Sequence, residues 1–289
     1  MFNLRRHPLA IFFTTAFGIS WFVMLPSILG PSGLGIFDTR LPNTFSIGSG
    51  HVTFPLWITI ASFGPTLAAL VTQRLCYGRF LGFRLWTSLR QILTGTVAGI
   101  FCVLLARWVL SALGLTRSGY TAWNWAALLN FRFYFMLSLV AGPIGEEPGW
   151  RGFALPLLQS RYRQLPYGSV RASLLLGLIW SAWHLPLFLL KGWTTSPFWV
   201  YAIIITSLSV MITLAYNLSG GSVITAILVH NTFNAGGAPL RDFLETATLR
   251  RHYDLIVACA FLLTATALTA LTLGNLGMKD SAAAEQDSA

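Results

Sequence analysis

The sequence predicts an all-α polytopic membrane bundle of about eight transmembrane helices. Three observations support this prediction. Of the 289 residues, 55% are hydrophobic and only 10% are charged, whereas a soluble domain has about 25% charged residues. Apolar runs long enough to cross a bilayer recur along the whole chain, and the arginines lie mostly between them. A bilayer explains this pattern because lipid requires an apolar outer surface.

Apolar runs define the predicted spans, since a transmembrane helix needs roughly 20 apolar residues. The runs are Leu9–Leu29, Phe54–Val71, Ile92–Leu113, Phe133–Ile144, Ser169–Leu190, Phe198–Leu218, Val223–Phe233 and Leu255–Leu273. The fourth and the seventh are short because polar residues interrupt them. Irregular backbone survives at membrane depth only inside protein or beside a wet cavity, so these two segments are candidates for a functional site.

The chain is interpreted as one transmembrane domain over residues 1–278. Its first apolar run follows Arg5 and Arg6 but is longer than a signal-peptide core and lacks an A-x-A-like cleavage site, so we expect a retained helix. The tail at residues 279–289 is polar and built from small residues, which predicts disorder.

Net charge is +10, from 17 Arg and 2 Lys against 9 acids. With the N-terminus inside, the inner loops carry 11 basic residues and the outer loops 7, which favours an N-in, C-in topology. The expected partner of these arginines is membrane lipid. No basic cluster with interleaved aromatic residues lies on a soluble segment, so we expect no nucleic-acid binding.

The placement of the acids is the most informative feature. Between Asp38 and Asp242 the chain contains only Glu146 and Glu147, directly after the apolar run FMLSLVAGPIG. An ionised side chain at membrane depth costs about 2.5–3.5 kcal/mol on insertion scales, so an adjacent pair needs compensation or a function. Glu147 and Arg151 are four residues apart and share a helix face, whereas Glu146 is rotated by about 100°. The pattern predicts a paired Glu147 and a freer Glu146 suited to general-base work. The alternative is a salt bridge that only fixes packing.

Glycine and proline surround this pair. In a continuous helix Pro148 leaves the carbonyl of Ile144 without a donor. Alternatively, a helix begins near Glu146 with Pro148 in its first turn. Either arrangement leaves irregular backbone with free polar groups beside the acids.

Two histidines lie inside apolar runs. His184 follows Trp180 by four residues in LLLGLIWSAWHLPLFLL, and His230 precedes Asn234 by four in SVITAILVHNTFN, so each pair shares a helix face. A lone intramembrane His is often a hydrogen-bonding link between helices. Two His, one Asn and two Glu on three helices of a nearly uncharged core favour a site instead.

These residues offer two routes to hydrolysis. In one, a glutamate takes a proton from water while His and Asn donate hydrogen bonds to the developing oxyanion. In the other, Glu146, His184 and His230 hold zinc, and the metal acidifies the water. The motif H-E-x-x-H is absent, and no Ser or Cys forms a triad pattern with His and an acid. The sequence leaves both routes open.

Three motifs in order resemble the CPBP family, the CAAX proteases and bacteriocin-processing (Abi) enzymes that include the type II CAAX prenyl endopeptidase. EEPGWRGFALP (Glu146–Pro156) is similar to the motif E-E-x-x-x-R, WSAWHLPLF (Trp180–Phe188) to F-x-x-x-H, and HNTFN (His230–Asn234) to H-x-x-x-N. Trp180 stands where the family commonly has Phe. The resemblance covers Phe135 to Asn234 and implies a catalytic core over residues 130–238.

The resemblance implies an intramembrane protease, either metallo- or glutamate-type. Glu146 with His184 would activate water, and His230 with Asn234 would stabilise the oxyanion. Glu147 would belong to the catalytic set, with Arg151 and Trp180 in support. The implied substrate is a membrane-associated peptide or protein, and the implied location is the bacterial inner (plasma) membrane. A non-proteolytic immunity or peptide-binding protein and a proton-coupled transporter remain the alternatives.

Overall fold

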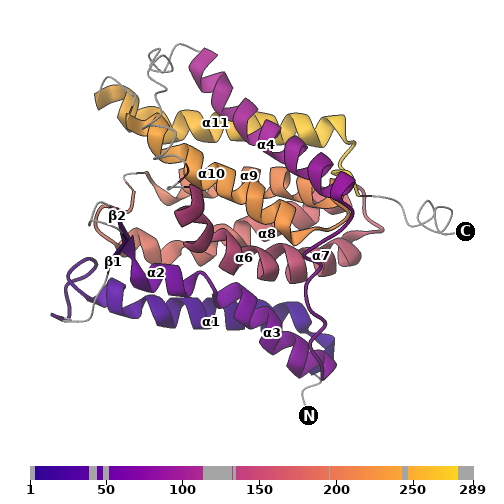
Figure 1. Ribbon diagram of the computed structural model, residues 1–289, viewed down its shortest axis with the longest axis horizontal. Coiled ribbons are helices and arrows are strands. Elements are labelled where there is room, and N and C mark those ends of the chain that lie inside the picture. The colour runs from indigo at the N-terminus through magenta and orange to yellow at the C-terminus, as the bar shows by residue number, and fades with distance from the viewer. Residues whose placement is uncertain are drawn as a thin grey trace, which may run out of the picture.

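The computed structural model describes most of the chain (Figure 1). The described residues are 4–38, 44–47, 52–112, 132, 135–194, 196–242 and 247–278, without the side chains of residues 4, 44–47, 52–55, 107–112, 236–242 and 247–253. The predicted disorder of residues 279–289 lies outside them and stays a prediction, as does the single-domain interpretation.

Helices dominate the described residues, which confirms the all-α class. They are α1 (Pro8–Leu29), α2 (Leu56–Ala61), α3 (Gly64–Tyr77), α4 (Leu89–Ala112), α6 (Pro143–Gly149), α7 (Leu155–Tyr162), α8 (Gly168–Trp183), α9 (Phe198–Leu218), α10 (Val223–Asp242) and α11 (Ala247–Leu271), with short 3₁₀ turns η1 (Leu4–Arg6) and η4 (Leu185–Leu189). Six segments among the described residues are long and apolar enough to cross a membrane, and the apolar part of α10, Val223–Ala235, is shorter. The chain is therefore an integral membrane protein, while the count of about eight spans stays a prediction.

The fourth predicted span is not one continuous helix. Residues 135–140 are helical, the chain turns at residues 141–142, and α6 begins at Pro143. Pro148 lies inside α6, not in its first turn, and a π-helical turn, η3 (Trp150–Ala154), follows. The first predicted alternative, a helix that continues through Pro148, is therefore confirmed, and the start near Glu146 with Pro148 in the first turn is wrong. A π-turn adds a residue to the helical turn and is common at functional sites.

The connection after α1 contains a hairpin that the sequence did not reveal. Strand β1 (Thr44–Ile47) pairs antiparallel with β2 (Val52–Pro55), with Thr44 opposite Pro55 and Ile47 opposite Val52. Its strands have four residues each, too few to give a clear alternating pattern.

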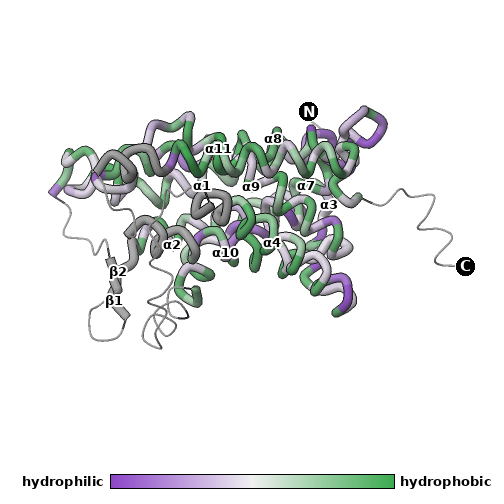
Figure 2. Tube along the Cα trace, turned by 90° about the horizontal axis from the view of Figure 1, so that it is seen from above, coloured by the Kyte–Doolittle hydropathy of each residue, from purple (hydrophilic) through white to green (hydrophobic). Residues whose placement is uncertain are grey.

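The helices pack side by side as a membrane bundle requires. In Figure 1, α1 and α3 lie together on one side, α6, α7 and α8 in the middle, and α9, α10, α4 and α11 on the other side. Hydrophobic residues follow the helices, and hydrophilic ones gather toward their ends (Figure 2). Large apolar side chains such as Phe22 and Leu271 face outward, as expected on a lipid-facing surface.

Aromatic rings join the middle helices to α1. Trp150 on η3 meets Phe12 on α1 edge-on at a centroid distance of 5.5 Å and Trp183 on α8 at 6.0 Å. All three rings are buried. Edge-to-face pairs of this kind add roughly 0.5–1.5 kcal/mol each beyond burial, so they fix α6 and η3 against their neighbours.

Glycines allow α6 to approach α3 at backbone distance. A Cβ built at Gly149 would lie 2.4 Å from the carbonyl oxygen of Pro65, and one at Gly145 would lie 2.7 Å from that of Ser62. Thr66 also donates to the carbonyl of Gly145 at 2.6 Å. Small residues at helix contacts are the usual means of close packing in membranes.

We expect Gly149→Ala to lower the free energy of unfolding by about 1–3 kcal/mol, because the added methyl group collides with backbone that cannot rotate away. The measurement is unfolding of the purified protein by SDS titration. Gly18→Ala in α1 is the matched control, because a Cβ there meets nothing within 4 Å. Equal stability of the two variants would contradict the close-contact explanation.

Candidate active site

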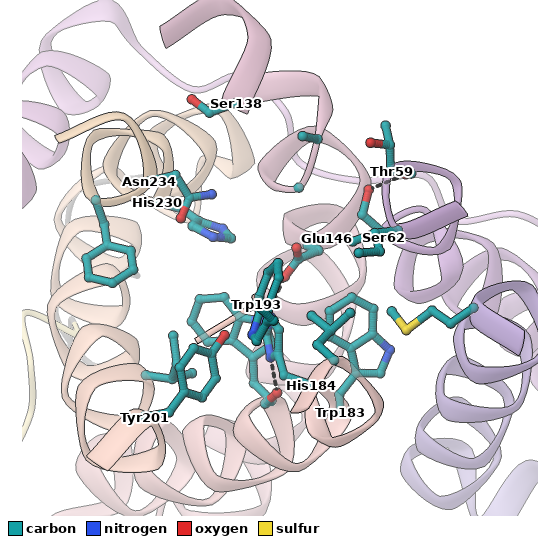
Figure 3. Close-up of a pocket in the computed structure, with 18 residues that line it drawn as sticks. Thr59, Ser62, Ser138, Glu146, Trp183, His184, Trp193, Tyr201, His230 and Asn234 are labelled. Atoms are coloured by element: carbon teal, nitrogen blue, oxygen red, sulfur yellow. Dashed lines mark hydrogen bonds between the residues drawn. The ribbon is translucent and has the colours of Figure 1, made fainter. Parts of the chain in front are cut away.

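One cavity of about 480 Å³ brings together residues from helices far apart in the sequence. Glu146 on α6, His184 at the end of α8, and His230 and Asn234 on α10 all line it. Figure 3 shows Glu146 on one side of the opening, His230 and Asn234 on the other, and His184 beside Tyr201. The four side chains therefore face one another as the sequence predicts, while their catalytic roles stay a prediction.

The start of α6 presents Glu146 to this cavity. Helix α6 begins at Pro143, and the N–H groups of Gly145 and Glu146 both donate to the carbonyl of Gly142 at 2.9 and 3.0 Å. A Cβ at position 142 would lie 3.0 Å from Oε1 of Glu146 and 3.6 Å from Nδ2 of Asn234. Glycine at this position therefore leaves room between the carboxylate and the amide.

Glu147 lies behind the cavity and has two partners. Arg151 Nη1 donates to its Oε1 at 3.0 Å, and His230 Nδ1 lies 2.8 Å from the same oxygen. Neither Glu147 nor Arg151 lines the cavity, and both side chains are fully buried. Removing one member of a buried ion pair typically costs about 3–5 kcal/mol. Glu147, which the sequence places in the catalytic set, thus contacts His230 from behind the cavity, and its catalytic role stays a prediction.

Trp180 contacts most of the polar side chains of the site. Its indole N–H donates to Oε2 of Glu146 at 2.7 Å, and its main-chain carbonyl lies 2.8 Å from Nδ1 of His184. The guanidinium carbon of Arg151 lies 4.3 Å from the ring centroid, and the ring of His230 packs edge-on at 4.9 Å. Phenylalanine, common at this motif position, has no N–H to donate. The Trp that departs from the motif therefore adds a hydrogen bond to Glu146.

His184 is held at the point where α8 ends. The helix stops at Trp183, and the 3₁₀ turn η4 begins at Leu185. The imidazole packs edge-on against Trp183 at 4.7 Å and Tyr201 at 5.3 Å. Because a carbonyl can only accept, Nδ1 is the nitrogen that donates to Trp180, and Nε2 is left for other partners.

Ser138 and Asn231 help to build the site, and sequence reasoning did not single them out. Ser138 lines the cavity and donates to Oδ1 of Asn231 at 2.6 Å, while Asn231 Nδ2 donates to the carbonyl of Phe135 at 2.9 Å. These bonds join residues 135–138 to α10. The only available signal was a second amide in the HNTFN motif, directly after His230.

Glu146, His184 and His230 line one cavity, but they are not grouped as a metal-binding cluster. Among the described residues, no three His, Cys, Asp or Glu side chains are grouped so that they could hold one metal ion. Glu146 uses one oxygen on Trp180, and His184 and His230 use Nδ1 on Trp180 and Glu147. These bonds do not involve Nε2 of either histidine or Oε1 of Glu146, and metal-binding histidines commonly donate their second nitrogen to a carbonyl or carboxylate, so zinc binding stays a prediction.

Comparison with known proteins agrees with the three motifs. Residues 128–236 match the family described as type II CAAX prenyl endopeptidase Rce1-like. CAAX prenyl protease 2 of Methanococcus maripaludis is 31% identical over 140 residues, which cover 45% of this chain and 48% of the relative. The chain thus spans about half the length of that relative. The match contains both glutamates, both site histidines and Asn234, so this part of the chain is similar to the CAAX proteases of the CPBP family.

Proposed function

We propose that the chain is an intramembrane endopeptidase that hydrolyses a peptide bond of a membrane-associated protein or peptide with water activated by Glu146. The observation that carries this proposal is the shared cavity, where the Glu146 carboxylate, which forms no salt bridge with the described residues, faces two imidazoles and an amide. The family match supports peptide-bond hydrolysis as the reaction.

Two acceptors orient the attacking water. Glu146 is held through Oε2 by Trp180, so Oε1 takes the proton of the water, and Nε2 of His184 accepts its second hydrogen bond. The water oxygen then bonds to the scissile carbonyl carbon. The resulting tetrahedral intermediate breaks its C–N bond when the protonated Glu146 passes the proton to the leaving amine.

The opposite wall stabilises the developing oxyanion. Asn234 donates through its amide nitrogen, and His230 donates through Nε2 when it carries a proton. Glu147 accepts from Nδ1 of His230 and so holds the ring in place, while Arg151 compensates the charge of Glu147. In this scheme Glu147 and Arg151 are positioning residues.

We further propose the metal-free glutamate route for this chain. Its support is that no three His, Cys, Asp or Glu side chains among the described residues are grouped so that they could hold one metal ion.

The cavity also indicates the kind of substrate. Apart from the four site residues, its walls include Met24, Ile58, Leu187 and Phe233, all apolar. Such walls fit an apolar peptide segment or a lipid-modified one. The relative is named as a protease of prenylated CAAX segments, and this substrate class is a candidate here. The proposed location is the bacterial plasma membrane with both termini inside.

We expect Glu146→Gln to lower cleavage of a membrane-proximal peptide by about 10²–10⁴-fold, because the amide keeps an acceptor for Trp180 but cannot take a proton. The measurement is cleavage of a fluorogenic peptide by protein reconstituted in liposomes. Ser62→Ala is the control, since Ser62 lines the same cavity but donates to the carbonyl of Thr59. Wild-type activity in the Glu146 variant would remove the hydrolase proposal. Peptide binding without cleavage by the wild type would favour the non-proteolytic alternative.

Metal removal tests the choice of route. We expect cleavage to persist after dialysis against EDTA and 1,10-phenanthroline, with metal content followed by inductively coupled plasma mass spectrometry. The residues that activate water in our scheme belong to the protein itself. Loss of activity on chelation and its recovery with added Zn²⁺ would establish the metal route and contradict the glutamate scheme.

A further inference from the structure

The connection between α3 and α4 combines exposed aromatic and aliphatic side chains with exposed arginines. We call residues 78–90 the basic strap; its sequence is GRFLGFRLWTSLR. Trp86 is 63% and Phe80 65% exposed, and Leu81, Leu85 and Leu89 are also exposed. Arg79, Arg84 and Arg90 lie between them and are exposed as well.

The strap has no regular secondary structure over residues 80–88, yet hydrogen bonds and packing attach it to the helices. The buried side chain of Gln73 accepts from the N–H of Leu81 at 2.8 Å and donates to the carbonyl of Gly82 at 3.3 Å. Phe83 points inward and packs against the core. The strap is therefore a shaped surface that keeps its apolar and basic side chains on the outside.

The strap also caps the helix that carries His230 and Asn234. The first N–H groups of α10, those of Val223 and Ile224, donate to the carbonyls of Arg84 and Leu85 at 3.0 and 3.4 Å. The hydroxyl of Ser222 donates to Leu85 as well, at 2.8 Å. Helix starts need such acceptors for their unpaired N–H groups, so the position of the strap and the seating of α10 are coupled.

The charge of the strap has no counterpart in the surrounding sequence. Between Asp38 and Asp242 the only acids are Glu146 and Glu147. Both are buried, and Glu147 binds Arg151. No carboxylate within residues 39–241 therefore remains for the arginines of the strap.

A membrane surface provides what this segment requires. Exposed Trp and Phe favour the boundary between headgroups and acyl chains, where irregular backbone can still meet water. Arginine beside them can reach lipid phosphates with a planar, bidentate donor group. Anionic headgroups supply the missing negative charge.

We propose that the basic strap is a binding site for anionic phospholipid, with Phe80 and Trp86 inserted at the interface and Arg79, Arg84 and Arg90 on the headgroups. Through the carbonyls of Arg84 and Leu85, a lipid bound there also steadies the first turn of α10. This inference is independent of the proposed proteolysis, because it concerns a surface outside the catalytic cavity.

Lipid binding by the full-length protein tests the proposal. The probes are fluorescently labelled phosphatidylglycerol and phosphatidylcholine, titrated against protein in mixed detergent micelles. We expect the wild type to prefer phosphatidylglycerol. The preference should fall by about fivefold for each strap arginine changed to glutamine, the factor that corresponds to roughly 1 kcal/mol per basic residue at an anionic surface.

The matched control removes the same charge from the same end of the bundle. Arg161, Arg163 and Arg171 are exposed near the start of α8. At the end of α9, Asn217 donates to Ser169 at the start of α8. The carbonyl of Ser219, two residues later, accepts from Thr87 of the strap. Both groups of arginines therefore lie near the end of α9. The triple variant R161Q/R163Q/R171Q should keep the lipid preference.

Added phosphatidylglycerol should also raise the thermal midpoint of the wild type and of the control, but not that of R79Q/R84Q/R90Q. Equal binding of the two lipids by the wild type would overturn the proposal without any variant. If both triple variants lost the preference for phosphatidylglycerol equally, the effect would be general electrostatic attraction, and the proposal of a specific lipid site would be wrong. If the preference for phosphatidylglycerol appeared only after removal of residues 279–289, the strap would bind the acids of that tail in the full-length protein, and the lipid proposal would be wrong.

Discussion

The indole of Trp180 is the contact on which the arrangement of the site depends. The indole N–H donates to Glu146, and the ring contacts Arg151 and His230. The main-chain carbonyl of Trp180 also accepts from Nδ1 of His184. One buried side chain on α8 thus contacts residues of α6, η3 and α10. Trp180 supplies the donor for the carboxylate that faces the cavity.

A second constraint separates the two adjacent glutamates. Because neighbours on a helix point about 100° apart, only Glu147 reaches Arg151 and His230, and Glu146 is turned to the cavity. The same apolar surroundings that make an unpaired acid costly leave it available for proton transfer. Charge is thus balanced behind the cavity wall, while Glu146 accepts a hydrogen bond from Trp180 and forms no salt bridge with the residues that the structure describes.

The sequence predicted the membrane fold and the set of polar side chains well, because a charge in an apolar run is rare enough to stand out. Glu146, His184, His230 and Asn234 could be recognised in the sequence for that reason, and the structure places all four in one cavity. The sequence did not predict the π-turn after α6, the hairpin after α1 or the bond between Ser138 and Asn231. Those features depend on which neighbour each backbone or hydroxyl group meets after packing. Trp180 could be recognised as an aromatic residue of a motif, but its bond to Glu146 follows only from the tertiary placement of α6 against α8.

The most direct test of this account is the cleavage rate of Trp180→Phe compared with that of Trp183→Phe. Both changes keep a buried aromatic ring, but only the first removes a hydrogen bond, since the indole N–H of Trp183 has no partner among the described residues. A hydrogen bond to a charged group is worth about 1.5–3 kcal/mol. We therefore expect Trp180→Phe to lose about 10- to 100-fold in rate at an almost unchanged thermal midpoint, while Trp183→Phe stays close to the wild type. Equal rates for the two variants would show that Trp180 does not position Glu146 and would contradict the account.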